Sequence, residues 1–532
     1  MTSTRNITLD SPKRQARERR VNAMLSLVQI HSDMHNGTLL AAVDLGSNSF
    51  RLEIGRFDHG LIHRTEYHKE TVRQGNGLDP ERNLTQDAMQ RGWDCLARFG
   101  ERLASFKNPQ VRAVATQTLR EARNRDEFLA RADKILGFPI DVISGREEAR
   151  LIYQGVAHLL PQSDEQRLVV DIGGRSTEMI VGQGLEPVTM ESYRVGSVAW
   201  SMKYFPQGIF SPRAFEMAEI AAKAVLDEAV DSYRASTWDV AYGSSGTIGA
   251  VSDVLTAAGW PAGLVTREGL DWLLDRLLKA QTAERIKLDG MKDDRRAVIG
   301  GGVSVLRAIF ELLGIEEMQA AQGALRHGVL YDLLDREQEL TDLRSTTVQR
   351  LASKFDTDAA QAERVGIVSR HLFVMACSGP PTAEFERFQR KLNWAAQLHE
   401  IGSQISHSDY HKHGAYILDN IDAPGFALPE LHRLSLLVLG HRGKLRKLEV
   451  NFEDREFIRQ LLCLRLAVIL CHARRDPDLD GLQLESGADP GRLFVLSCRQ
   501  GWAERFPQSA YLIREEVVAW QKTPWTLIVS GL

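Results

Sequence analysis

Cysteine is scarce in this chain of 532 residues: its five scattered thiols form no CxxC pair, and their odd number is typical of a reducing compartment. Long apolar runs are also missing. Even residues 461–471 are interrupted by Arg465, so no run approaches the roughly 18 residues of a membrane-spanning helix. A net charge of only −4 excludes a strong overall field, so a site for a polyanion has to come from local basic patches.

The remaining composition is that of an ordinary globular protein, with 43% hydrophobic and 26% charged residues. It excludes collagen-like, mucin-like and wholly disordered chains. The length predicts three or four domains at roughly 150 residues each. The basic stretch Lys13–Arg20 lacks the apolar core of a secretory signal and predicts a solvated tail, with weak contact with an anionic surface as the alternative.

Strand and helix patterns alternate from Leu39 to about Glu337, which predicts an α/β core, and helical patterns dominate after it. Strands are predicted at Leu39–Val43, Arg51–Phe57, Val111–Ala115, Ile140–Ile143 and Leu493–Ser497. Helices are predicted at Glu81–Leu103, Phe128–Leu136, Asp358–Met375, Glu384–Glu400, Pro429–Leu439, Arg455–Ala473 and near Ala510–Gln521. The predicted division is a tail (1–38), two α/β domains (39–155 and 156–337), a helical domain (338–480) and a small C-terminal domain (481–532).

An internal repeat carries most of the chemical information. Residues 43–55 and 170–182 share a Val-Asp pair, a Gly two residues after the Asp, a Ser and a closing Gly, and each copy predicts a strand, a tight turn and a strand. Small residues let main-chain N–H groups surround a phosphate, and the Asp of each copy can hold Mg²⁺ directly or through water. Two such hairpins predict a clamp on a phosphate chain, with ordinary glycine-rich turns as the alternative.

Other segments add candidates. The turn Gly243–Thr247 is compatible with packing or with an anion site at a helix start, and Gly300–Gly302 favours packing. The segment Ser144–Arg150 opens a helix with two glutamates, which serve either the helix dipole or the deprotonation of a water. Arg120 follows a strand and suits a bidentate contact with phosphate.

These motifs together resemble the exopolyphosphatase/guanosine pentaphosphate phosphatase family, in the sugar kinase/actin superfamily. The resemblance rests on AVDLGSNSF (42–50), SGREEARLIYQGV (144–156), VVDIGGRSTEMIVG (169–182), GSSGTIGA (243–250), ALRHGVLYDLL (324–334) and LHEIGSQISHSDYHKHGAYIL (398–418). It implies two actin-like (ribonuclease H-like) α/β domains, then a helical HD-like domain and a small C-terminal α+β unit.

The resemblance also implies roles for single residues. Glu148 matches the catalytic base, and Asp44, Asp171 and Glu178 match the acidic groups associated with Mg²⁺. The implied phosphate-binding residues are Gly46, Ser47, Asn48, Ser49, Arg120, Gly173, Gly174, Arg175, Ser176 and Thr177. Two positions depart from the family: Arg175 stands where a small residue, usually Gly, is common, and His327 stands where Glu is common.

The C-terminal half is rich in histidine. His399-Glu400 resembles the His-Asp pair of HD-type phosphohydrolases, but Glu replaces the metal-binding Asp, so a degenerate domain is expected rather than a working metal centre. The predicted role is electrostatic, a channel for a polyanion, with a solvated basic face as the alternative. The channel residues are Lys412, Arg442, Lys444, Arg446 and Lys447.

We therefore expect a Mg²⁺-dependent exopolyphosphatase that releases orthophosphate from inorganic polyphosphate, with hydrolysis of guanosine pentaphosphate to the tetraphosphate as the alternative. The basic run Arg442–Lys447 favours the polymer. A sugar or acetate kinase and an actin-like or chaperone ATPase are disfavoured by the motif that contains Glu148. The family resemblance suggests a homodimer. A cytoplasmic location is expected, with peripheral membrane contact as an alternative, and nucleic acid is not an expected partner.

Overall fold

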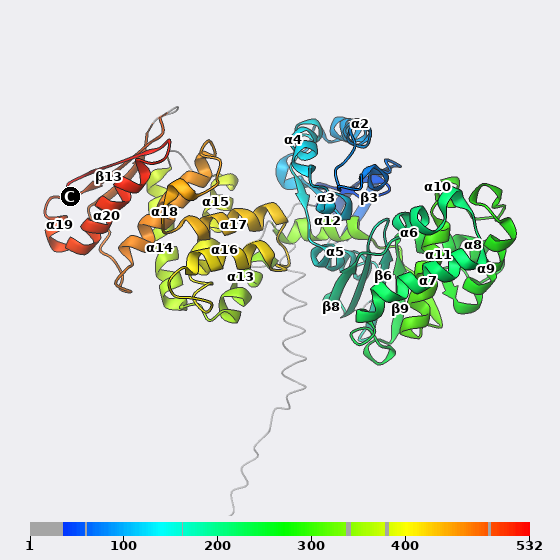
Figure 1. Ribbon diagram of the computed structural model, residues 1–532. Coiled ribbons are helices and arrows are strands. Elements are labelled where there is room, and N and C mark those ends of the chain that lie inside the picture. The colour runs from blue at the N-terminus through cyan, green and yellow to red at the C-terminus, as the bar shows by residue number, and fades with distance from the viewer. Residues whose placement is uncertain (1–35, 59–60, 162, 337–341, 378–381, 488–490) are drawn as a thin grey trace, which may run out of the picture. The chain divides into compact units, whose positions relative to one another are not determined.

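A computed structural model describes residues 36–532 except for 59–60, 162, 337–341, 378–381 and 488–490. The chain divides into two compact units, Met1–Gln338 and Glu339–Leu532, and each is described by itself (Figure 1). Of the tail predicted over residues 1–38, only residues 36–38 are described.

The first half of unit 1 is a five-stranded sheet with helices. Its elements are β1 (Leu39–Leu45), β2 (Phe50–Asp58), β3 (Leu61–Glu70), α2 (Gln86–Leu103), β4 (Val111–Ala115), α3 (Gln117–Glu121), α4 (Arg125–Leu136), β5 (Ile140–Val142) and α5 (Gly145–Ala157). The strand order is β3-β2-β1-β4-β5. Strands β1, β2 and β3 pair with one another in antiparallel fashion, and β4 and β5 continue the sheet in parallel from β1.

The second half repeats this topology. Its elements are β6 (Gln166–Ile172), β7 (Thr177–Gln183), β8 (Glu186–Tyr193), α6 (Ser197–Tyr204), α7 (Pro212–Leu226), β9 (Val240–Ser244), α8 (Ser245–Ala257), β10 (Leu264–Thr266), α9 (Arg267–Ala280), α10 (Asp293–Arg296), α11 (Ile299–Leu313), β11 (Glu317–Ala320) and α12 (Leu325–Arg336). The order β8-β7-β6-β9-β11 matches the first sheet, and β10 adds an antiparallel edge. The sequence repeat is therefore a repeat of fold.

The predicted strands of unit 1 are present with small shifts in their ends, but β3 and β8 lack a clear pattern in the sequence. In β3 seven of the ten residues are exposed and none is buried, so no alternation of buried apolar and exposed polar residues marks it. The helix predicted from Glu81 begins instead at Gln86. Thr85 caps it by accepting a hydrogen bond from the Ala88 N–H, and Arg82 just before it has a left-handed backbone that a helix cannot include.

Helices α5 and α12 pack against each other in the middle of unit 1 (Figure 1). Their buried side chains form one core with residues of both sheets, including Leu40 and Val114 from the first and Val169 and Ile180 from the second. Consecutive apolar residues in β1 and β6 reflect this burial, because both faces of each strand are covered. The packing places the first turn of α5 near the ends of β1 and β6.

Unit 2 is a helical assembly followed by a three-stranded sheet. Its elements are α13 (Leu343–Lys354), α14 (Ala359–Ala376), α15 (Ala383–Leu398), α16 (Tyr410–Asn420), α17 (Leu428–Gly440), α18 (Arg455–Leu470), β12 (Leu482–Ser486), β13 (Leu493–Cys498), α19 (Trp502–Arg505), α20 (Pro507–Trp520) and β14 (Thr526–Ser530). One hydrophobic core joins the helices to the sheet, since Leu462 and Phe494 belong to the same cluster. The expected fold class is confirmed: two actin-like α/β halves, a helical part and a small α+β element. The five-part division stays a prediction.

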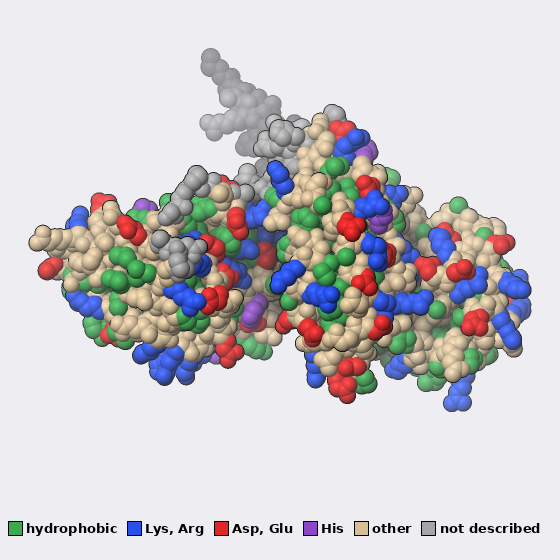
Figure 2. Space-filling model, turned by 90° about the horizontal axis from the view of Figure 1, so that it is seen from above, with side chains coloured by type: hydrophobic (Ala, Val, Ile, Leu, Met, Phe, Trp, Pro, Cys, Tyr) green, Lys and Arg blue, Asp and Glu red, His purple; other side chains and the backbone are tan. Residues whose placement is uncertain are grey.

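The surface carries charges of both signs. Figure 2 shows Lys and Arg side chains interspersed with Asp and Glu on the visible face, in keeping with the net charge of −4. Among the described residues, none of the helices combines the length and the apolar composition that crossing a bilayer requires.

Candidate active site

The turns of the two repeats meet at their tips. Gly46–Ser49 connect β1 to β2, and Gly173–Ser176 connect β6 to β7. In the second turn the Gly173 N–H donates to the Ser176 carbonyl at 2.9 Å, which closes the loop. A methyl group on Gly174 would lie 3.1 Å from Ser47 Cβ, so a side chain there would push the tips apart.

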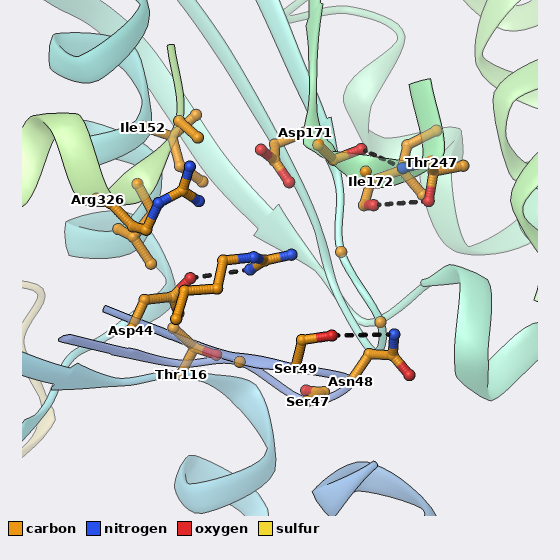
Figure 3. A pocket seen from close by; sticks show the side chains of 18 of the residues that line it. Asp44, Ser47, Asn48, Ser49, Thr116, Ile152, Asp171, Ile172, Thr247 and Arg326 are labelled. Carbon is orange, nitrogen blue, oxygen red and sulfur yellow. Dashed lines mark hydrogen bonds and ion pairs between the residues drawn. The ribbon is translucent and has the colours of Figure 1, made fainter. Parts of the chain in front are cut away.

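The tips border a pocket of about 280 Å³ (Figure 3). Figure 3 shows Asp44 and Ser47–Ser49 on one side of it and Asp171 with Thr247 on the other. The predicted site residues that line the pocket are Asp44, Gly46, Ser47, Asn48, Ser49, Glu148, Asp171, Gly173, Gly174 and Ser176. Two hairpins from distant parts of the chain thus face one small polar cavity, as a clamp on a phosphate chain requires.

Glu148 reaches the pocket from the first turn of α5. Ser144 caps this helix by accepting a hydrogen bond from the Glu147 N–H at 3.2 Å. The side chain of Glu148 is largely buried, and its Oε2 accepts a hydrogen bond from Nη1 of Arg120 at 2.7 Å. Burial raises the pKa of Glu148, Arg120 opposes that shift, and Asp44 and Asp171 add to it. A carboxylate with a raised pKa at a phosphate pocket is suited to accept a proton.

Three more acids surround Glu148, and they differ in position. Asp44 and Asp171 line the pocket, whereas Glu178 lies behind it and accepts a hydrogen bond from Ser192 Oγ at 2.7 Å. Asp44 forms a 2.9 Å ion pair with Arg51. Burial raises the pKa of Asp171, and it raises that of Glu178 well above its usual value, with Glu148 adding to the second shift. Such carboxylates favour a nearby cation.

The carboxylates at the pocket are the groups that could bind Mg²⁺. Within the described part of the chain, no group of three or more His, Cys, Asp or Glu side chains is arranged to hold a metal ion. Mg²⁺, however, is commonly bound by one or two carboxylates together with substrate phosphates and water. Asp44 and Asp171 supply two carboxylates on facing sides of the pocket, so the residues present fit an ion shared with a phosphate ligand.

Four predicted residues do not line the pocket: Arg120, Arg175, Thr177 and Glu178. Arg120 is occupied by Glu148 and by the Ile143 carbonyl. Thr177 donates its hydroxyl hydrogen bond to the Val195 carbonyl at 2.6 Å. The phosphate role expected for Arg175 is not supported by its position, because its guanidinium contacts Glu121 and the Gly75 carbonyl instead.

Several cations at the pocket were missed from the sequence: Arg51, Lys69, Arg295 and Arg326. Burial lowers the pKa of Lys69 and of Arg295, and Arg51 lowers both further. Arg51 and Lys69 also pair with the carboxylates of Asp44 at 2.9 Å and Asp294 at 2.6 Å, but the convergence of these cations on one polar pocket suits an anion. Arg51 lies two residues after the first turn and Arg326 lies in the motif at 324–334, so both had a weak signal in the sequence. Lys69 and Arg295 lie on elements with no motif.

The two other glycine-rich segments, 243–247 and 300–302, differ in their position relative to the pocket. Ser245, Gly246 and Thr247 line the pocket at the start of α8, so this turn contributes to the site. Gly300–Gly302 are buried where α11 packs on α6, as favoured from the sequence: the Gly301 N–H donates to Ser201 Oγ at 3.0 Å.

The expected polyanion channel corresponds in part to a cavity of about 600 Å³ in unit 2. Lys412, Arg442, Lys444 and Lys447 line it, but Arg446 does not. His411 also lines it, and its buried Nδ1 has no hydrogen-bond partner among the described residues. The arrangement is a basic pocket between the start of α16 and the segment after α17.

The His399-Glu400 pair has structural partners. His399 is buried with Nδ1 2.7 Å from the Ala396 carbonyl oxygen, and burial lowers its pKa. Glu400 pairs with Arg474 at 2.8 Å. The pair therefore contributes to packing within the helical unit.

Comparisons with known proteins identify the family. Residues 54–337 match the model described as the Ppx/GppA phosphatase family, and residues 343–516 match that of Ppx/GppA phosphatase, domain III. The chain belongs to the Ppx/GppA phosphatase family. Membership agrees with the expected hydrolase class and disfavours the kinase and chaperone alternatives.

Individual members of the Ppx/GppA family are similar over long stretches. The guanosine-5'-triphosphate,3'-diphosphate pyrophosphatase of Aeromonas hydrophila subsp. hydrophila is 38% identical over 497 residues, which is 92% of this chain and 99% of the relative. A solved exopolyphosphatase from Cytophaga hutchinsonii is 25% identical with a TM-score of 0.51, covering 56% of this chain and 98% of its own. A solved exopolyphosphatase-like protein is 25% identical with a TM-score of 0.50, covering 55% and 97%.

Proposed function

We propose that this protein hydrolyses the terminal phosphoanhydride of guanosine pentaphosphate, giving guanosine tetraphosphate and orthophosphate. The observation that carries the proposal is the pocket, which is lined by Glu148, by the two glycine-rich turns and by a cluster of cations, Arg51, Lys69 and Arg295. The similarity to the Aeromonas pyrophosphatase over nearly the whole chain supports it. The sequence favoured polyphosphate because of the basic run Arg442–Lys447, but the relative that is similar over nearly the whole chain is named for the nucleotide activity, so we prefer the nucleotide.

The substrate carries phosphates at both the 5' and the 3' positions, and the pocket has two regions that suit them. The turns Gly46–Ser49 and Gly173–Ser176 suit the 5'-triphosphate through main-chain N–H groups and hydroxyls. The cluster of Arg51, Lys69 and Arg295 suits the second phosphate group, since all three cations line this pocket and burial, with repulsion among them, lowers the pKa of Lys69 and of Arg295. A polyphosphate chain has no such second group.

The chemistry proposed for the site is in-line attack by water. Glu148 accepts a proton from the water as its oxygen bonds to the terminal phosphorus, and the bond from that phosphorus to the bridging oxygen breaks. Orthophosphate leaves with the attacking oxygen, and the bridging oxygen stays on the nucleotide. Arg120 holds the carboxylate of Glu148 by the 2.7 Å ion pair.

We also propose that Asp44 and Asp171 hold Mg²⁺ together with the substrate phosphates, with the charge of Glu178 behind them. The ion, when bound, neutralises charge on the phosphate oxygens. Asp44 is held toward the pocket by its pair with Arg51, while Ser244 and Arg51 oppose the burial that raises the pKa of Asp171.

The test is orthophosphate release with and without Mg²⁺ from guanosine pentaphosphate and from long-chain polyphosphate, at matched concentrations of terminal phosphate. We expect Mg²⁺-dependent release with a higher kcat/KM for the nucleotide. Higher kcat/KM for the polymer would replace the proposal with the exopolyphosphatase activity. Release from neither substrate would overturn both.

The basic cavity of unit 2 favours exopolyphosphatase as the second candidate. Lysine and arginine bind a phosphate chain without sequence preference and with an affinity that falls as salt rises. Replacing Lys444 and Lys447 with alanine is then expected to weaken binding of long polyphosphate and flatten its salt dependence. Arg446→Ala is the matched control, because Arg446 is exposed in the same run but outside the cavity. Equal effects of all three changes would contradict a role for the cavity.

A further inference from the structure

Arg175 stands where the family resemblance leads us to expect a small residue, and its side chain reaches across to the other half of unit 1. Arg175 lies in the turn between β6 and β7. Its Nη2 donates to Glu121 Oε2 at 2.9 Å and its Nη1 donates to the Gly75 carbonyl at 3.2 Å. Glu121 ends α3, and Gly75 lies in a short 3₁₀ segment, Gln74–Gly77. One guanidinium thus joins the second hairpin to two elements of the first half.

The contact continues as a chain of hydrogen bonds toward the catalytic base. Glu121 Oε1 accepts from Gln117 Nε2 at 2.6 Å. Gln117 Oε1 accepts from Arg120 Nη2 at 2.7 Å and from its Nε at 3.1 Å. Arg120 Nη1 then donates to Glu148 Oε2 at 2.7 Å. All the side chains between Arg175 and Glu148 are at least three-quarters buried, so water competes weakly for these bonds.

The Gly75 contact ties the same arginine to the first hairpin. The Gly75 N–H donates to the Ser47 carbonyl at 2.8 Å, so the 3₁₀ segment supports the turn that lines the pocket. Ser47 in turn lies against Gly174 of the second hairpin. Arg175 therefore contacts Gly75, which supports the turn of the first hairpin, and Glu121, which leads to Glu148 through Gln117 and Arg120.

We propose that Arg175 is a positioning residue: through Glu121, Gln117 and Arg120 it holds the carboxylate of Glu148 where the two hairpins meet. The inference rests on the proposed role of Glu148 as the base. It assigns the family departure at position 175 a function other than phosphate binding. The side chain supplies a connection between the halves that a glycine at this position cannot make.

The test is steady-state kinetics with guanosine pentaphosphate for Arg175→Met, Glu121→Gln and the double variant. Misplacing the base is expected to lower kcat about 10- to 100-fold in each, with KM changed less than about threefold. The double variant should be no worse than the poorer single variant, because both break one chain. Arg175→Lys should recover part of kcat. Arg307→Met is the control, since Arg307 forms a 2.7 Å pair with Glu219 of similar exposure away from the pocket.

A loss that falls on KM for Arg175→Met, with Glu121→Gln unaffected, would overturn the proposal in favour of phosphate binding. Loss equal to that of Arg307→Met would indicate a structural role only. An inactive wild-type protein would refute the proposed function, and hydrogen exchange then decides the inference. Arg175→Met should speed exchange in peptides that cover residues 117–121 and 144–150, and unchanged exchange would refute it.

Discussion

Single residues that break the family pattern have specific partners in this protein. Arg175 pairs with Glu121, as described above. His327, which stands where the family resemblance leads us to expect glutamate, places Nε2 3.1 Å from Oε1 of the buried Glu53. Arg326 binds the other oxygen of Glu53 at 3.0 Å. The histidine at this position therefore contacts a buried carboxylate that Arg326 also binds.

The pair around Glu53 predicts a pH effect on stability. Burial opposes ionisation of Glu53, but His327 and Arg326 overcome it and lower its pKa to about 2, below the usual 4.5. A lowered pKa in the folded state stabilises the protein above about pH 4.5, and this stabilisation is lost as pH falls toward 2. Glu53→Gln should reduce the free energy of unfolding at pH 7 by up to about 3 kcal/mol. Urea unfolding across pH should show the difference shrinking below pH 4.5, and a constant difference would contradict this.

Glu148→Gln removes the base and keeps the size of the side chain. We expect kcat to fall about 100- to 10,000-fold with KM changed only a few-fold, because the carboxylate acts on the water rather than on the bound phosphates. The measurement is orthophosphate release, with substrate binding checked by calorimetry. Glu127→Gln on the exposed face of α4 is the control. Near-normal turnover of Glu148→Gln would remove Glu148 from the mechanism.

At the scale of elements, the crossing of α5 and α12 sets the position of the base. The helices approach so closely that a methyl group on Gly328 would collide with the Leu151 carbonyl, and one on Gly155 with the Ala324 carbonyl. Buried ion pairs from Asp332 of α12 to Arg112 and Arg150 lie at the same contact. The helix that carries Glu148 is thereby fixed against the helix that carries Arg326.

This crossing predicts the effect of a small substitution. Gly328→Ala should lower the free energy of unfolding by about 1–3 kcal/mol, because neither backbone can move away without disturbing the shared core. Gly249→Ala in α8 is the matched control: no atom lies within 4 Å of its added methyl group. Alanine there should be neutral or stabilising through its helix propensity. Urea unfolding of both variants measures the effect, and equal stability would contradict the close crossing.

At the scale of the whole molecule, the chain has two compact units with separate hydrophobic cores. The catalytic candidates all lie in unit 1 and the basic cavity lies in unit 2. Family models match each unit separately, over residues 54–337 and 343–516. Binding of substrate and any contribution from the basic cavity are therefore separable by experiment.

Separate cores predict separate unfolding. Scanning calorimetry should resolve two transitions, and a phosphate ligand of the pocket should raise the midpoint of only one of them, since a ligand stabilises the unit that binds it. Guanosine tetraphosphate, the proposed product, serves as the ligand. A single transition that shifts as a whole would show instead that the two units unfold cooperatively.

The sequence alone determined the repeat of the hairpins, the candidate base and most of the strands. These features are local: turn residues, apolar runs and a capped helix start are encoded within a few neighbouring positions. The sequence pattern predicted that α2 begins at Glu81, but it begins at Gln86, because Thr85 caps it and Arg82 has a left-handed backbone. The exposed edge strand β3 carried too little pattern to be found.

Only the tertiary structure decided which side chains meet at the pocket. Lys69 and Arg295 lie more than two hundred positions apart in the chain, and the packing of the two halves brings both to one cavity. The same packing places the guanidinium of Arg175 against Glu121 instead of in the pocket. Such pairings depend on distances between distant segments, and those distances exist only once both sheets have closed around α5 and α12.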